Sequence, residues 1–173
     1  ERGRVRTGES VWIVWRHNDM ITTELKCDAT DREVLLVHKE DGNYTSCESH
    51  KWSTRLETNY FISAKQQLRF TMQWTALKAF EDRFWQVNPN SREFLRSVAN
   101  PDSTPDDFAI SRLTFQARYR WEIAPLSDLF VVYTRGSNLP RDNFQSFQEL
   151  LEQSWNDRIV DTIAIKLRYR LGS

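Results

Sequence analysis

The sequence predicts an all-β protein whose strands follow one another as an antiparallel up-and-down meander, with one short amphipathic helix in a loop. Three observations support this fold class. Long segments alternate apolar and polar residues, short and long connections alternate along the chain, and aromatic residues gather on the apolar faces. Successive side chains of a strand point to opposite faces, so the alternation indicates a sheet with one apolar and one polar surface.

The clearest strand covers residues 111–123. From Leu113 to Ile123 the odd positions are Leu, Phe, Ala, Tyr, Trp and Ile, whereas the even positions from Arg112 to Glu122 are Arg, Thr, Gln, Arg, Arg and Glu. The segment contains no Gly or Pro and is rich in aromatic residues, which strands favour. A helix would scatter both sets around its circumference, so the pattern predicts one long strand.

Five more segments are predicted as strands from alternation or from β-branched and aromatic content. Two of them form a hairpin across Ser63-Ala64-Lys65, and Ala124-Pro125-Leu126-Ser127-Asp128 is a second tight turn. The five segments are residues 11–15, 51–62, 66–77, 129–135 and 159–171.

The polar region after the first strand is less regular. Residues 21–27 and 33–38 can pair as a hairpin across residues 28–31, and Asp41-Gly42-Asn43 is a turn signal. Residues 91–98 are interpreted as a helical turn.

Apolar residues recur at helical spacing near the C-terminus. Phe144, Phe147, Leu150, Leu151 and Trp155 alternate with Gln and Glu, so an amphipathic helix is expected over residues 144–155. Its N-cap is expected at Asp142 or Asn143.

The remaining ranges are predicted as long loops, at residues 17–50, 78–107 and 136–158. Short turns at one end, long loops at the other and strands of about 11 to 14 residues are typical of outer-membrane barrels. Because the smallest bacterial barrels have about eight strands, the six predicted strands indicate one partial barrel domain over residues 1–173, within a longer chain. The alternative is a soluble antiparallel β-barrel or sandwich that acts as a binding module with an apolar interior.

In the membrane interpretation the apolar face meets lipid and the polar face lines the lumen. Aromatic side chains on the apolar face are expected to form a girdle at the lipid interface: Trp52, Tyr60, Trp74, Tyr119, Trp121, Tyr133 and Tyr169. Basic side chains on the polar face are expected to form a lumen wall, either a surface that favours anionic solutes or a structural network paired with acids on other strands: Arg55, Arg69, Arg112, Arg118, Arg120, Lys166, Arg168 and Arg170.

Composition excludes several functions. Twenty-four basic and 24 acidic residues leave no net charge to recruit nucleic acid. No run of about 18 apolar residues occurs, so no transmembrane helix is predicted. Cys27 and Cys47 are either bridged or free thiols.

Catalytic and cofactor signals are weak. The three histidines, His17, His38 and His50, lack metal-ligand spacing, and five glycines form no phosphate-binding loop. The only local nucleophile candidate is His50 with Ser49 or Ser53. The sequence therefore predicts neither an enzyme, nor a metal site, nor a cofactor.

Four stretches resemble the C-terminal barrel of domain-of-unknown-function family 5916, whose longer members begin with a module similar to carbohydrate-binding module family 9. The similarity extends from about Trp52 to the end. It implies a Gram-negative outer-membrane location, with the lipid bilayer and the N-terminal strands or module of a longer chain as partners. It also implies a pore or an anchor linked to carbohydrate handling, with an unknown solute. The stretches are residues 59–69, 108–121, 129–136 and 166–170.

Overall fold

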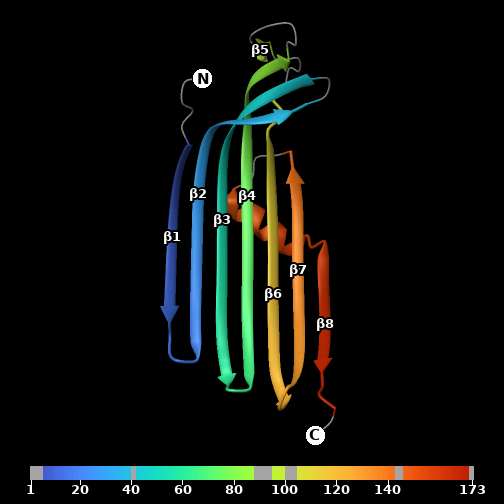
Figure 1. Ribbon diagram of the computed structural model, residues 1–173. Helices are drawn as coiled ribbons and strands as arrows, with labels where there is room; N and C mark the ends of the chain where they lie inside the picture. Colours follow the sequence, from blue (N-terminus) through green and yellow to red (C-terminus); the bar gives the residue numbers. More distant parts are fainter. Residues whose placement is uncertain (1–5, 40–41, 88–94, 100–104, 143–145, 172–173) are drawn as a thin grey trace.

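The computed structural model describes residues 6–39, 42–87, 95–99, 105–142 and 146–171. Within these ranges the chain forms eight strands and one helix (Figure 1). The elements are β1 (Arg6–Arg16), β2 (Ile21–His38), β3 (Asn43–Ser63), β4 (Gln66–Val87), β5 (Leu95–Val98), β6 (Phe108–Ala124), β7 (Ser127–Arg141), α1 (Phe147–Asn156) and β8 (Val160–Arg168).

The strands form one antiparallel sheet in the order β1-β2-β3-β4-β6-β7-β8, and β5 pairs only with the end of β4. Three short turns, β1–β2, β3–β4 and β6–β7, lie at the same end of this meander (Figure 1). In the first, the Asn18 side-chain oxygen accepts hydrogen bonds from the backbone N–H groups of Met20 and Ile21. The predicted meander and both predicted tight hairpins are therefore confirmed.

Strand register keeps like faces together across the sheet. On the apolar face one row of directly opposed residues is Ile21, Tyr60, Leu68, Tyr119, Val131 and Ile165. The next row, on the polar face, is Thr22, Asn59, Arg69, Arg118, Val132 and Ala164. Because a register slip of one residue would exchange the faces, the alternation in each strand specifies this pairing.

Helix α1 packs on the apolar face, behind β4, β6 and β7 in the view of Figure 1. Its fully buried Leu150 joins Trp74, Ala76, Ala109 and Leu113 in the only hydrophobic cluster found among the described residues. The remaining face of the helix carries Gln and Glu side chains. The expected amphipathic helix is thus present and uses its apolar stripe as the pattern predicts.

The start of the helix differs from the expectation. Ser146 is the N-cap, and it forms a capping box with Glu149. Asp142 is therefore wrong as the cap, because Ser146 stands three residues before a Glu that can return a hydrogen bond. Asn143 and Phe144 lie outside the described residues.

The predicted long loops at residues 17–50, 78–107 and 136–158 consist in large part of strand. β2 fills residues 21–38, β4 continues to Val87, and β7 continues to Arg141. The predicted hairpin within residues 21–38 is wrong, because residues 28–31 pair with β1 on one side and with β3 on the other. Hydrogen bonds to two neighbouring strands outweigh a turn signal that includes neither Gly nor Pro.

One smaller expectation changes, and one open alternative is decided. The part of residues 91–98 that the structure describes is strand β5, not a helical turn, because it extends the sheet beside the end of β4. Cys27 and Cys47 are both free thiols. Cys27 of β2 lies opposite Thr54 of β3, and Cys47 lies seven residues before Thr54 on that strand, which corresponds to roughly 23 Å along the sheet.

Candidate functional site

The polar face of the sheet holds the predicted basic wall, which the structure divides into separate groups. On β3 and β4, Arg55 and Arg69 share the carboxylate of Glu57. The Arg55 Nη2–Glu57 Oε2 distance is 3.3 Å, and the Arg69 Nε–Glu57 Oε1 distance is 3.8 Å. Arg69 also donates to Asn59 at 2.7 Å. These two cations are partners in a structural network.

A second group forms around Asp128, at the short-turn end of the sheet. Its side chain is only 2% exposed and lies between Arg120 of β6 and Arg168 of β8. Arg120 Nη2 lies 3.0 Å from one carboxylate oxygen, and Arg168 binds the other. Asp128 was expected in a tight turn, and this role was not predicted. Asp128 lies opposite Arg168 of β8 and opposite Glu122 of β6, two residue pairs below Arg120, and a strand alignment would have supplied this signal.

Arg118 and Lys166 form a third group, and neither makes an ion pair within the described part of the chain. They border a groove of about 400 Å³ that is otherwise lined by Phe130, Val132 and Ala164. Arg118 donates only to Gln116, at 3.2 Å. Arg118 and Lys166 are therefore two cations without an acidic partner in the described residues, and they lie beside an apolar surface on the polar face of the sheet.

The last two predicted cations lie apart from these groups. Arg112 borders another groove of about 410 Å³, together with Ser49, Lys51 and Thr75. Arg170 follows β8, where its backbone N–H donates to Ser127 Oγ at 3.0 Å. The structure does not gather all eight cations into one site.

The predicted aromatic girdle occupies two levels of the apolar face. Tyr60, Tyr119 and Trp121 lie near the short turns, whereas Trp52 and Trp74 lie eight and six register steps higher. Trp74 is buried beneath α1, and its indole N–H donates to Ser111 at 2.9 Å. The two remaining members, Tyr133 and Tyr169, lie between the levels and beyond the end of β8, respectively.

Helix α1 covers polar side chains that interrupt the apolar face. The Arg135 guanidinium lies 4.8 Å from the centre of the Trp155 ring, and the Lys78 ammonium lies 4.5 Å from the centre of the Phe147 ring. Ser111 Oγ lies 2.5 Å from Ser154 Oγ, and it also donates to the Leu150 carbonyl. The helix thus supplies partners for polar groups on a face that is otherwise apolar.

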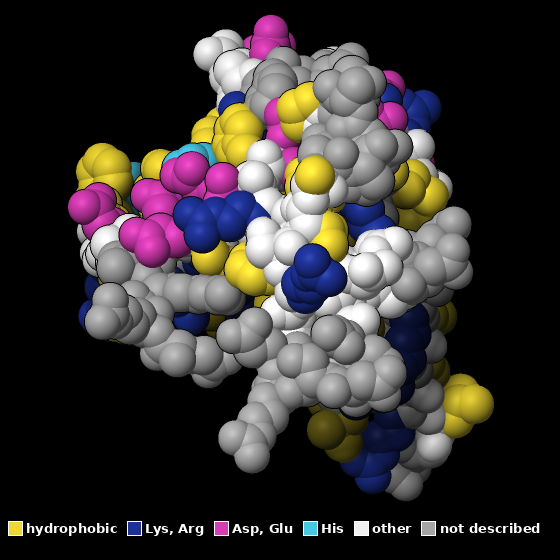
Figure 2. All heavy atoms as spheres, turned by 90° about the horizontal axis from the view of Figure 1, so that it is seen from above, with side chains coloured by type: hydrophobic (Ala, Val, Ile, Leu, Met, Phe, Trp, Pro, Cys, Tyr) yellow, Lys and Arg dark blue, Asp and Glu magenta, His cyan; other side chains and the backbone are white. Residues whose placement is uncertain are grey.

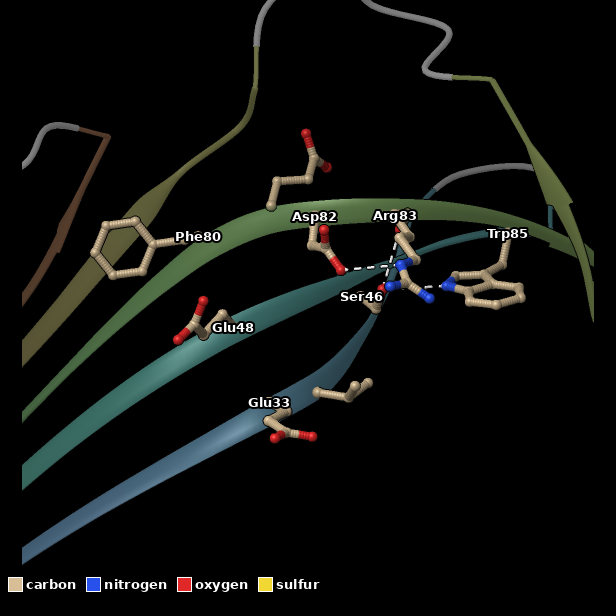
Figure 3. Close-up of a pocket in the computed structure, with 9 residues that line it drawn as sticks. Glu33, Ser46, Glu48, Phe80, Asp82, Arg83 and Trp85 are labelled. Carbon is tan, nitrogen blue, oxygen red and sulfur yellow. Dashed lines mark hydrogen bonds and ion pairs between the residues drawn. The ribbon is translucent and has the colours of Figure 1, made fainter. Parts of the chain in front are cut away.

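The end of the sheet opposite the short turns is acidic. Figure 2 shows Asp and Glu side chains gathered there. A hollow of about 520 Å³ lies between β2, β3 and β4, and Figure 3 draws the residues that line it. Asp82 pairs with Arg83 at 3.2 Å, and Trp85 donates to Ser46. Among the described residues no group of His, Cys, Asp and Glu is arranged to hold a metal ion.

Lys39 anchors a network beside this hollow. Its ammonium lies 2.7 Å from both Glu81 and Asp106. Partial burial alone would lower the pKa of Lys39, but the hydrogen bonds to Asp106 and Glu81 outweigh burial and raise that pKa above its ordinary value. Burial also raises the pKa of the neighbouring Cys47 thiol to about 11.

The candidate Ser–His pair is not assembled. His50 points to the apolar side of its strand, where Nδ1 lies 2.6 Å from Asp31 and the ring packs on Phe80. Ser49 and Ser53 are an odd number of residues away on the same strand, so their side chains point to the other face. Ser53 instead hydrogen-bonds Thr75 at 2.7 Å.

Over the part of the chain that the structure describes, these features define an all-β protein built as an antiparallel meander sheet, with one apolar face, one polar face and a single covering helix. The chain belongs to the family described as Domain of unknown function (DUF5916), whose model matches residues 3–172. No curated protein and no solved structure is significantly similar to it. Among the described residues, no helix has the length and apolar character needed to cross a membrane.

Proposed function

We propose that this chain forms part of the wall of a bacterial outer-membrane β-barrel, with the apolar face toward lipid and the polar face toward the lumen. The observation that carries the proposal is an apolar band at one level across all seven strands of the meander. Below helix α1 its rows contain no charged side chain. One such row is Trp15, Thr23, Thr58, Phe70, Ala117, Tyr133 and Ile163.

The height of the band supports this proposal. On β6 the apolar face runs from Leu113, which α1 covers, to Ile123, ten residue steps away. This corresponds to about 34 Å along the strand and, at the tilt of about 40–45° usual for membrane barrels, to a height of about 25 Å. Outer-membrane barrels expose an apolar band of about this height, bordered by aromatic residues. Trp121 lies at the lower margin of the band, whereas at the upper margin helix α1 covers Trp74 and itself borders the exposed apolar surface.

The position of α1 is consistent with the same proposal. The helix covers the part of the apolar face where Lys78, Ser111 and Arg135 occur, and it leaves the rows below it, which carry no charged side chain, open. An unpartnered charge in contact with lipid is costly. A helix that shields these groups and turns Gln and Glu outward suits the interfacial level above the hydrocarbon.

The lumen wall would favour anionic solutes at the groove between Arg118 and Lys166, since unneutralised cations select by charge. Replacing both by Glu should shift the reversal potential of the full-length protein in a planar bilayer toward cation selectivity. The double variant Arg55→Gln/Glu57→Gln, which removes an ion pair without changing the net charge of the wall, is the matched control and should leave the reversal potential nearly unchanged. An unchanged reversal potential in the Arg118/Lys166 variant would remove the anion-selective pore from the proposal.

The soluble alternative is favoured by one specific observation, namely that α1 packs on the apolar face as a core helix would. The two functions differ in one gel experiment on the full-length protein from fractionated cells. A membrane barrel should be found in the outer membrane and should migrate faster before boiling than after it. A protein in the soluble fraction with no mobility change would support a soluble domain whose apolar face is its interior.

A further inference from the structure

Strands β1 and β8 are the two edges of the meander, and they run in the same direction. The path holds seven strands, and each neighbouring pair is antiparallel. The first and seventh strands must then be parallel to each other. Figure 1 shows both arrowheads at the end that carries the short turns.

Both edges are also open among the described residues. Ile163, Ile165 and Leu167 on β8 are 60–70% exposed, and residues 11–15 on β1 are 50–68% exposed. Each edge presents a row of backbone N–H and C=O groups without strand partners. Such an edge is a template for a further strand, and it is not tolerated in contact with lipid.

Direct contact between the two edges would give a parallel pair. This holds within one chain, and it also holds for two copies related by an axis along the strands. Two copies joined edge to edge in antiparallel fashion would be inverted relative to each other, which places their α1 helices at opposite ends. Neither arrangement gives an antiparallel barrel with one membrane orientation.

We propose that an odd number of further antiparallel strands of the same polypeptide joins β8 to β1, so that the closed sheet has an even strand number. This inference rests on the proposed function, and it identifies the partner of both sheet edges as further strands of the same polypeptide. The strand beside β8 should place apolar side chains opposite Ile163, Ile165 and Leu167. It should place an acidic side chain near Lys166, which has no ion-pair partner in the described residues.

Cysteine cross-linking in the full-length protein tests the closure. In a Cys27→Ser/Cys47→Ser background, Ile165→Cys is combined in turn with Val11→Cys, Ile13→Cys or Trp15→Cys, and membranes are oxidised. We expect no disulfide within a chain or between copies. The matched control is Tyr133→Cys with Ile163→Cys, directly opposed on β7 and β8, which should cross-link.

The positive arm uses the single variant Ile165→Cys in the same background, with a benzophenone group attached to the introduced thiol and the photoproduct mapped by mass spectrometry. The expected product joins residue 165 to a segment of the same chain outside residues 6–168. A product on β1 or a β1–β8 disulfide would overturn the proposal. The proposed function is judged separately: a soluble protein with the expected photoproduct would retain the odd-strand closure and reject the membrane location.

Discussion

Removal of the Leu150 side chain should release helix α1 from the sheet without unfolding the strands. Leu150 is fully buried against Trp74 and Leu113, whereas the helix has only ten residues and is not covalently held elsewhere by a disulfide. An isolated helix shorter than about 12 residues is marginal in water. Undocking should therefore also melt the helix.

The size of the effect follows from the burial of this side chain. Leu150→Ala removes three buried carbons at about 0.8 kcal/mol each, or about 2.4 kcal/mol of transfer free energy. The residual cavity raises the loss to about 3–4 kcal/mol, inside the measured range for buried Leu→Ala changes. Since about 1.4 kcal/mol is tenfold in an equilibrium constant, the undocked population should rise roughly 100- to 700-fold.

The assay is thiol labelling at residue 154, whose side chain is 1% exposed in the docked helix. Ser154→Cys is introduced into the full-length Cys27→Ser/Cys47→Ser protein, and the labelling rate is compared with and without Leu150→Ala. The rate should rise by the factor given above, up to that of a fully exposed thiol. The control is Glu152→Ala, on the exposed side of the same helix, which should change the rate less than about threefold.

A labelling rate that Leu150→Ala leaves within threefold of the parent would refute this reasoning. Such a result would mean that α1 does not dock through Leu150, and the shielding of Arg135 and Lys78 by the helix would lose its basis. Far-ultraviolet circular dichroism should show that the strand content is unchanged in both variants.

Three further predictions concern the cap and the thiols. Ser146→Ala removes the helix cap and should weaken helix docking by about 1 kcal/mol. The thiol-labelling rate at residue 154 should therefore rise about fivefold. An unchanged labelling rate would count against the capping box. The Ser146 backbone N–H and hydroxyl lower the pKa of Glu149 below its ordinary 4.5, so this stabilisation is complete above pH 4.5 and is lost as pH falls further. The hydrogen-exchange protection of α1, measured against the intrinsic amide rate at each pH, should fall below pH 4.5, except in Glu149→Gln, and equal pH profiles of protection would contradict the capping box. With its pKa near 11, buried Cys47 should react with maleimide far more slowly than Cys27 at pH 8, and faster reaction of Cys47 would show that β3 is open at this level.

The parts of the fold predicted from the sequence are those where a two-residue period decides the structure. Strand β6 and the β3–β4 hairpin were expected because apolar and polar side chains alternate in them, with Phe61 as the exception. The same alternation rule did not identify residues 28–31 as strand, because Asp, Ala, Thr and Asp are residues typical of a turn. Their strand conformation depends on partners in β1 and β3 that are distant in sequence.

The candidate site shows the same limit. The pattern assigned the basic side chains to one face, but it could not pair them, since pairing depends on register between strands. The Arg120–Asp128–Arg168 group needs three strands aligned at once. The location of α1 on the apolar face was likewise not predicted, because the amphipathic pattern shows that a helix has an apolar stripe but does not identify the surface that the stripe covers.

The most direct test of the central claim compares two neighbouring residues of strand β6 that face opposite sides of the sheet. An environment-sensitive fluorophore is attached to Ala117→Cys or to Gln116→Cys, in the full-length Cys27→Ser/Cys47→Ser protein reconstituted in vesicles that contain a lipid-borne quencher. The proposal predicts strong quenching at residue 117 and little at residue 116. Equal quenching, or stronger quenching at residue 116, would contradict a sheet whose apolar face meets lipid.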